Sequence, residues 1–249
     1  MTLDESQLAT ARQRLAFPLD YPTLEAARVG AERVKASMGV LKVGLELFVA
    51  EGPAAVALGS ELGMSVFLDL KLHDIPATVE RAVASACQLG ASYLTLHAAG
   101  GPRMLEAASN RASRENTGLC LLAVTVLTSL DADDLARVGV QATPAAQAER
   151  LGKLAVDCGI GGLVCSPAEV GKLRSQLGPR PVLVTPGIRP SGSEVGDQKR
   201  VGTPTEAIQN GSSMLVVGRP VRDAADPERA ALGLATEVAA ALSAGARAQ

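Results

Sequence analysis

The sequence predicts a (β/α)8 TIM barrel, and three observations lead to that fold class. Short apolar runs alternate with longer amphipathic stretches along all 249 residues. The runs are continuous and mostly apolar, as expected for parallel strands that are buried on both faces. The length suits one α/β barrel, and no change in composition marks a linker. We therefore expect a single barrel domain over residues 1–249.

The apolar runs are the expected strands, at 14–19, 40–45, 64–70, 92–97, 119–126, 160–165, 181–185 and 213–217. Helical spacing follows at 23–37, 53–63, 76–90, 143–159, 166–178, 203–211 and 227–244. Several of these stretches begin with Thr, Ser or Pro and end at Gly, which are residues typical of helix ends. A doubly wound open sheet is the alternative, but no GxGxxG motif follows the first strand.

Composition and charge make several classes of protein improbable. Hydrophobic residues make up 47% of the chain but aromatic residues only 2%, so Ala, Val and Leu must form the core. The net charge of −2 disfavours binding to nucleic acid. Four scattered cysteines without a CxxC pair indicate reduced thiols. The polar, acidic start lacks a signal peptide's apolar region, and no apolar run has the ~18–20 residues of a membrane span. We therefore expect a cytoplasmic protein without a membrane partner.

Charged residues crowd the end of the third expected strand, in the motif DLKLHDIP at 69–76. Asp69 and Lys71 are two residues apart, so both should face the barrel axis. Lys42 on the neighbouring strand can share that side. Buried ammonium and carboxylate groups must pair, because leaving either alone costs several kcal/mol.

Two interpretations of this cluster stay open. The first is a structural salt-bridge cluster that plugs one end of the barrel. The second is an acid–base site in which Asp69 and Asp74 keep Lys71 cationic, so that the lysine can donate a proton. Active sites of barrels lie at the carboxyl ends of their strands, which favours the second interpretation.

The loops after the last two strands are typical of a phosphate site. Arg189 follows the seventh strand, and Gly218 and Arg219 follow the eighth. Between them a polar, Gly- and Ser-rich segment predicts a mobile lid near 189–202. Asp20 follows the first strand. Thr128 follows the fifth, where it belongs to the site or, with Ser129, caps the next helix.

The two histidines do not form a convincing metal site with their acidic neighbours. His73 and His97 lie on different expected strands, and Asp69 and Asp74 have lysines as partners. His97 is interpreted as a core histidine bonded to a backbone group rather than as a catalytic one. We therefore expect no metal ligands.

Together these motifs resemble the orotidine 5′-phosphate decarboxylase family in its common bacterial form. The resemblance is near full length and includes LKVGLELF, DLKLHDIPATV, LTLHAAGG, TPGIRP, DQKRVGTP and VVGRP. It implies a barrel homodimer without metal or organic cofactor. The implied reaction converts orotidine 5′-phosphate to UMP and CO2, the last step of de novo pyrimidine synthesis.

The resemblance also implies roles for individual residues. Lys71 would protonate C6, Asp69 would lie beside the departing carboxylate, and Lys42 would pair with Asp69 and touch the ribose. Asp74, Ile75 and Thr78 would reach into the partner subunit's site. The remaining substrate contacts would come from Asp20 at the ribose, Thr128 at the pyrimidine, Gln198 between base and phosphate, Arg189, Gly218 and Arg219 at the phosphate, and Pro76.

Two other functions remain as alternatives. Metal-dependent phosphosugar enzymes of the same suprafamily, such as 3-keto-gulonate-phosphate decarboxylase or hexulose-phosphate synthase, use magnesium with the third-strand aspartate and a further acidic ligand. Glu46 could serve as that ligand here, although Lys42 occupies the pocket and Gln198 suits a nucleobase better. A non-catalytic UMP-binding protein is the other alternative, but a binder needs no buried charges at a reacting carbon.

Overall fold

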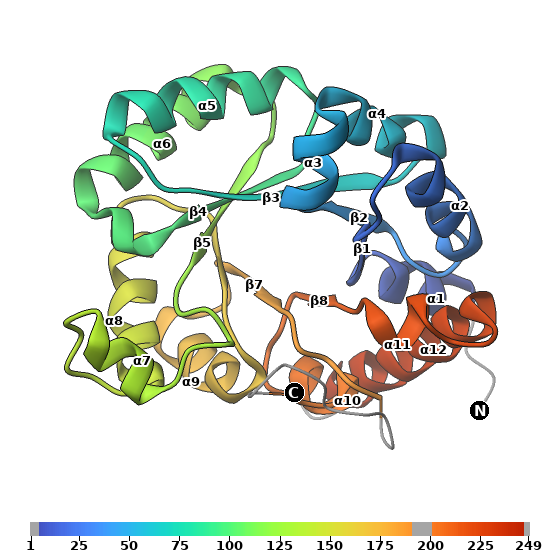
Figure 1. Cartoon of the computed structure of the whole chain (residues 1–249). Helices are drawn as coiled ribbons and strands as arrows, with labels where there is room; N and C mark the ends of the chain where they lie inside the picture. Colours follow the sequence, from blue (N-terminus) through green and yellow to red (C-terminus); the bar gives the residue numbers. More distant parts are fainter. Residues whose placement is uncertain (1–4, 191–200, 247–249) are drawn as a thin grey trace.

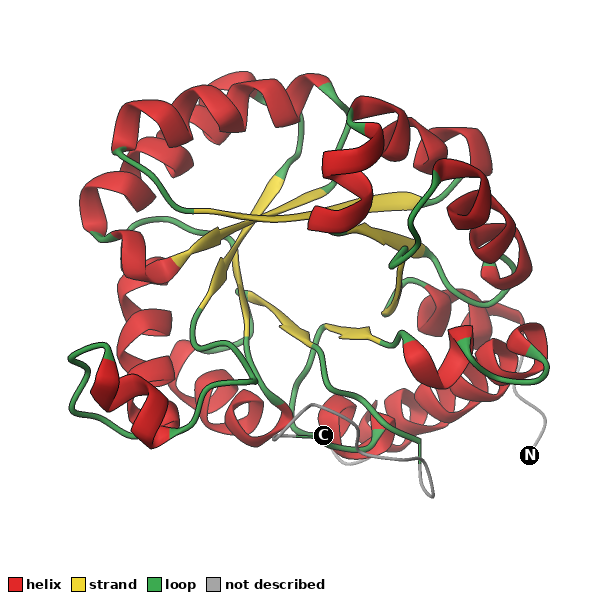
Figure 2. Cartoon of the chain, viewed as in Figure 1, coloured by secondary structure: helices red, strands yellow, loops and turns green. Residues whose placement is uncertain are grey.

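The computed structural model describes residues 5–190 and 201–246, and within them parallel strands close into a barrel (Figures 1 and 2). The doubly wound alternative is wrong, because β1 pairs with β8 as well as with β2. Most strands are slightly shorter than predicted. They are β1 (Leu15–Pro18), β2 (Val40–Val43), β3 (Ser65–Leu72), β4 (Tyr93–His97), β5 (Cys120–Val124), β6 (Gly162–Val164), β7 (Val182–Thr185) and β8 (Met214–Val216).

Helices surround the barrel as an outer ring (Figure 2). In the described part of the chain, no helix is long and apolar enough to cross a membrane. The helices are α1 (Glu5–Arg12), α2 (Leu24–Val34), α3 (Leu45–Glu51), α4 (Pro53–Leu62), α5 (Pro76–Gln88), α6 (Pro102–Glu115), α7 (Ala132–Arg137), α8 (Pro144–Asp157), α9 (Pro167–Leu177), α10 (Pro204–Gln209), α11 (Arg219–Arg222) and α12 (Pro227–Ala246), with the short 3-10 turn η1 (Ala98–Gly100) before α6.

Helix starts follow the capping residues of the sequence. The hydroxyls of Thr23 and Thr143 accept hydrogen bonds from backbone N–H groups in the first turns of α2 and α8. Asp131 caps α7 through a reciprocal capping box with Asp134. The interpretation of Thr128 as the cap of the next helix is therefore wrong.

The strands alternate between an inner and an outer layer of the core. Val40 and Phe67 pack inside the barrel, whereas Leu41 and Leu68 pack outward with the helices. This alternation carries the next residue of each strand, Lys42 in β2 and Asp69 in β3, to the inner side. Two charged side chains thus point into the barrel just above its apolar filling.

Candidate active site

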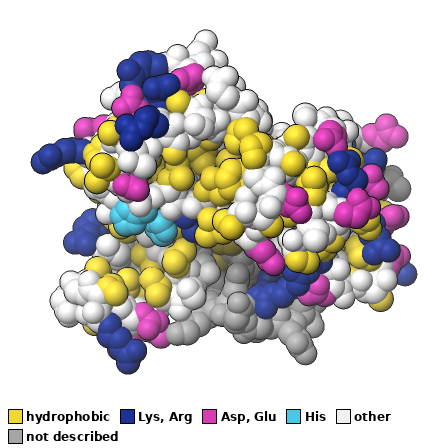
Figure 3. Space-filling view, turned by 45° about the horizontal axis from the view of Figure 1, so that its top comes forward, with side chains coloured by type: hydrophobic (Ala, Val, Ile, Leu, Met, Phe, Trp, Pro, Cys, Tyr) yellow, Lys and Arg dark blue, Asp and Glu magenta, His cyan; other side chains and the backbone are white. Residues whose placement is uncertain are grey.

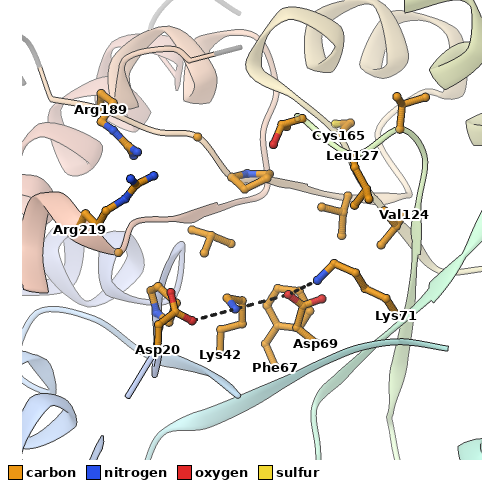
Figure 4. Close-up of a pocket in the computed structure, with 18 of the residues that line it drawn as sticks. Asp20, Lys42, Phe67, Asp69, Lys71, Val124, Leu127, Cys165, Arg189 and Arg219 are labelled. Atoms are coloured by element: carbon orange, nitrogen blue, oxygen red, sulfur yellow. Dashed lines mark hydrogen bonds and ion pairs between the residues drawn. The ribbon is translucent and has the colours of Figure 1, made fainter. Parts of the chain in front are cut away.

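A cavity of about 410 Å³ opens at the carboxyl ends of the strands (Figure 4). Its wall combines charged groups from the β1, β2, β3, β7 and β8 ends with an apolar surface, formed by Phe67, Val124, Val126, Leu127, Val164 and Val216. Asp69 and Lys71 line open space rather than filling the barrel end. The interpretation as a purely structural plug is therefore disfavoured.

The charged side chains form a row of alternating sign, shown by the dashed lines in Figure 4. Lys42 Nζ lies 3.7 Å from Asp20 Oδ1 and 3.4 Å from Asp69 Oδ2, and Lys71 Nζ lies 2.8 Å from the same Asp69 oxygen. A Cβ atom at Gly44 would approach Lys42 Nζ to 3.2 Å, so a glycine here leaves room for the ammonium group. The row places two ammonium groups against one carboxylate at the cavity wall.

Asp69 is the most deeply buried member of this row, with 9% of its surface exposed. Burial alone would raise its pKa, but the ammonium groups of Lys42 and Lys71 and hydrogen bonds from Lys71 and Thr95 together hold the pKa below the usual range. Asp69 is therefore ionised at neutral pH. Removing one partner of such a buried pair typically costs ~3–5 kcal/mol.

Lys71 reaches the cavity through an irregular backbone. Asp69 and Lys71 both line the cavity, as their two-residue spacing predicts. However, Lys71 has a φ of 51°, in the left-handed region, and the pairing of β3 with β4 shifts register between Leu68 and Leu72. Regular alternation along the strand therefore does not by itself place this lysine. The backbone N–H of Lys71 donates to the hydroxyl of Thr95 in β4, a residue that the sequence analysis missed.

Two arginines occupy the opposite side of the cavity. Figure 4 shows the guanidinium groups of Arg189 and Arg219 turned toward each other across the pocket from the charged row. The Arg189 guanidinium donates to the backbone oxygen of Ile188 at 2.8 Å. A Cβ at Gly218 would come within 2.8 Å of Pro18, so a glycine is needed at this close approach. Converging guanidinium groups suit an anion such as phosphate.

The predicted lid falls largely outside the described residues, and so does Gln198. The chain on either side of that segment is held together. Ile188 and Gly202 form a parallel bridge, and the N–H of Arg189 donates to the oxygen of Gly202 at 2.9 Å. Arg189 is thus anchored from both its backbone and its side chain.

Asp74, Ile75 and Thr78, which were expected to serve a partner subunit, lie outside this cavity, and so does Pro76, an expected substrate contact. Asp74 and Ile75 are exposed in the loop after β3, and Pro76 and Thr78 belong to the first turn of α5. The Asp74 carboxylate accepts a hydrogen bond from the Ile75 N–H at 2.6 Å. None of the four lines the pocket, whereas Thr128 does.

Sequence reasoning also missed Arg222, which lines the cavity from α11. Its guanidinium donates to the backbone oxygen of Asp20 at 3.3 Å and forms an ion pair with Asp223. The available signal was its spacing, three residues after Arg219, which places both on one side of a helical turn. No comparable spacing in the sequence indicated that Thr95 would lie at the site.

Glu46, the acidic ligand considered for the metal-dependent alternative, is not in the cavity wall. Glu46 is exposed in the first turn of α3 and does not line the pocket. Across residues 5–190 and 201–246, no group of three or more His, Cys, Asp or Glu side chains could hold a metal ion.

His73 and His97 form a pair beside β3 and β4, with ring centroids 5.4 Å apart (cyan in Figure 3). His97 is half-buried and does not line the cavity. Burial is the main cause that lowers the pKa of His97 below its usual 6.5, and the neighbouring His73 and Lys71 lower it further. Nearby Asp69 opposes this shift but does not reverse it.

This histidine pair predicts a pH dependence of stability. His97 takes up a proton on unfolding when the pH lies between its folded and unfolded pKa values. The free energy of unfolding should therefore fall as the pH drops from 6.5 toward the lower folded value. Urea denaturation between pH 5 and about 7 should show a shallower slope for His97→Gln than for the unchanged protein.

His73→Gln is the matched control for that measurement. It removes one neighbour of His97 but leaves the burial that is the main cause of the shift, so it should flatten the slope less. Equal slopes for His97→Gln and the unchanged protein would contradict the assignment of this pH dependence to His97.

The fold and this cavity define a class, a barrel enzyme whose cavity has a row of alternating charges on one side and two arginines on the other. The family model described as Orotidine 5'-phosphate decarboxylase / HUMPS family matches residues 13–234. The chain belongs to this family, and the family resemblance and barrel fold expected from the sequence are confirmed.

Several named proteins are similar to this chain over most of its length. A protein of Anaeromyxobacter sp. (strain K) named orotidine 5'-phosphate decarboxylase is 55% identical over 223 residues, covering 90% of this chain and 97% of that protein. One from Chromohalobacter salexigens with the same name is 49% identical over 225 residues, covering 90% and 95%. The crystal structure of Orotidine 5'-phosphate decarboxylase from Lactobacillus acidophilus superposes with a TM-score of 0.78 at 34% identity, covering 91% and 99%. The name of these relatives denotes a carboxy-lyase.

Proposed function

We propose that this chain is an orotidine 5′-phosphate decarboxylase that forms UMP and CO2, the last step of de novo pyrimidine synthesis. The observation that carries the proposal is the cavity itself. One side holds the row of Asp20, Lys42, Asp69 and Lys71, and the other holds converging arginines. A nucleotide fits this arrangement, because its base can lie against the charged row while its phosphate binds between the arginines. Relatives with that name at 55% identity support the assignment.

In the proposed mechanism, the bond between C6 and the carboxyl carbon breaks and leaves its electron pair on C6. CO2 departs, and the pair is held by the ammonium group of Lys71. A fixed cation close to the developing charge stabilises it more strongly in a water-poor site than in bulk water. Lys71 then gives a proton to C6, which yields UMP, and recovers its proton from solvent.

Asp69 and Lys42 prepare Lys71 for this step. The ionised Asp69 holds Nζ of Lys71 at 2.8 Å, and Nζ of Lys42 lies 3.4 Å from the same Asp69 oxygen. Asp69 would also lie against the substrate carboxylate, whose repulsion is released as CO2 leaves. The apolar wall keeps water away from the carbanion.

The remaining polar residues would bind the parts of the substrate that do not react. Arg189, Arg219 and Gly218 would hold the phosphate, with Gln198 closing from the lid. Asp20 would bind the ribose and Thr128 would lie near the pyrimidine. The phosphate binds far from C6, but the free energy of that binding can be used to close and organise the site. It thereby raises the rate of decarboxylation.

We also propose a homodimer with shared sites. Leu45, Val49 and Ile75 are large apolar side chains with 52%, 81% and 66% of their surface exposed. They follow neighbouring strands β2 and β3 at the cavity end of the barrel. Covering them with a second copy would remove this apolar surface from water and bring Asp74, Ile75 and Thr78 toward the partner's cavity. The cytoplasmic location stays a prediction from the sequence.

An absorbance assay tests the reaction and the absence of a metal requirement together. The purified protein should consume orotidine 5′-phosphate, seen as falling ultraviolet absorbance while UMP forms. Because the proposed charge stabilisation comes from Lys71, added EDTA should leave the rate unchanged within about twofold.

The same assay separates the alternatives. Turnover of a hexulose or pentulose phosphate only after magnesium is added would replace the proposal with the metal-dependent function and direct attention to Glu46. Tight UMP binding without any turnover would support the non-catalytic binder. A magnesium requirement for orotidine 5′-phosphate itself would overturn the metal-free mechanism alone.

A further inference from the structure

Thr95 is a fully buried threonine in β4, and its hydroxyl serves two residues of the charged row at once. It donates to Asp69 Oδ1 at 2.9 Å and accepts from the backbone N–H of Lys71 at 2.9 Å. A hydroxyl has one donor and two acceptor positions, so both bonds can form together. Among the described residues, Thr95 alone hydrogen-bonds to both Asp69 and the Lys71 backbone.

The hydroxyl occupies the place where the two strands lose their regular pairing. Leu68 pairs with Leu94 and Leu72 pairs with Leu96, so three residues of β3 stand opposite Thr95 alone. Lys71 lies in this bulge with its φ of 51°. The Thr95 side chain satisfies the Lys71 N–H at the point where the ladder is interrupted, and so supports the conformation that turns the lysine.

The same hydroxyl fixes the Asp69 carboxylate. Oδ1 is bonded to Thr95, which leaves Oδ2 to face the ammonium groups of Lys71 at 2.8 Å and Lys42 at 3.4 Å. Rotation of the carboxylate would break at least one of these interactions. Thr95 therefore sets both the orientation of the carboxylate and the backbone from which the lysine projects.

From this geometry we infer that Thr95 is a positioning residue, which holds Asp69 and Lys71 in the arrangement that the reaction requires. The inference rests on the proposed function, since it assigns Thr95 a role in the same decarboxylation. Thr95 itself does not line the cavity. It acts through the two residues that do.

Thr95→Val tests the inference, because valine keeps the branched shape and removes only the hydroxyl. We expect kcat to fall by at least about 30-fold with KM changed less than about threefold, since small misplacements of catalytic groups are costly. Thr95→Ser keeps the hydroxyl and should retain kcat within about threefold.

Thr185→Val is the matched control for loss of a buried hydroxyl. Thr185 lies in β7 on the other side of the barrel, is fully buried, and shares a 2.8 Å hydrogen bond with Ser212. It should lower the melting temperature but preserve kcat. Unchanged kcat in Thr95→Val would overturn the inference, and so would an equal loss of kcat in Thr185→Val.

Hydrogen exchange at the Lys71 amide gives a second readout that does not need turnover. In Thr95→Val this N–H loses its partner, so its exchange should speed up at least about tenfold, while Thr95→Ser should stay slow. Unchanged exchange would overturn the positioning role even if the unchanged protein proved inactive. Inactivity of the unchanged protein with altered exchange in Thr95→Val would instead count against the proposed decarboxylation alone.

Discussion

Replacing Lys71 with alanine should reduce decarboxylation by at least about 10³-fold while UMP still binds within about tenfold of its original affinity. The ammonium group both stabilises the carbanion and supplies the proton, so one change removes both contributions. UMP already carries its hydrogen at C6 and keeps the arginines at its phosphate. Stopped assays of turnover and calorimetric titration with UMP measure the two quantities separately.

Lys153→Ala is a suitable control, because Lys153 is an exposed lysine that pairs with the also exposed Asp157 on α8. It should match the unchanged protein in both turnover and UMP affinity. Circular dichroism should show that Lys71→Ala remains folded, since Asp69 retains Lys42 and Thr95 as partners. Turnover by Lys71→Ala comparable with that of the control would refute the role of Lys71.

Mixing two inactive variants should restore activity if the sites are shared between subunits. Lys71→Ala lacks the proton donor but keeps Asp74, and Asp74→Ala has the opposite defect. In a mixed dimer, one site combines the intact Lys71 of one subunit with the intact Asp74 of the other. Random exchange makes half of the dimers mixed, so activity should reach about a quarter of the unchanged level.

The position of Asp74 motivates this experiment. Its carboxylate is exposed outside the cavity of its own chain and lies next to the exposed Ile75. Subunit exchange should be verified with differently tagged chains, recovered together by sequential purification. Verified mixed dimers that remain inactive would show that Asp74 does not complete the partner's site.

Much of the fold could be predicted, because the signals for it are local. Each strand is a short apolar run, and prolines and threonines mark many helix starts. Helix α6 was missed, since only Met104, Leu105 and Ala108 are buried along it and its composition is mostly polar. The short helices α7 and α11 offer too few turns for a periodic pattern.

The candidate site was predictable only in part, for a related reason. Spacing within one strand brought Asp69 and Lys71 to the same side, and the cavity contains both. The backbone N–H of Lys71, which has a left-handed conformation, bonds to a hydroxyl from the next strand, 24 residues away in sequence. Such a contact exists only after the barrel closes, and no local pattern encodes it.

The backbone of Lys71 has a consequence for attempts to make this protein more heat-resistant. A non-glycine residue in the left-handed region costs roughly 1–2 kcal/mol, and glycine or asparagine avoids much of that cost. Replacing Lys71 with glycine would relieve that cost but would also remove one partner of the buried Asp69, which costs ~3–5 kcal/mol, so the ion pair outweighs the backbone strain. Stabilising substitutions are therefore best sought on the outer helices, with positions 69–71 and 95 left unchanged.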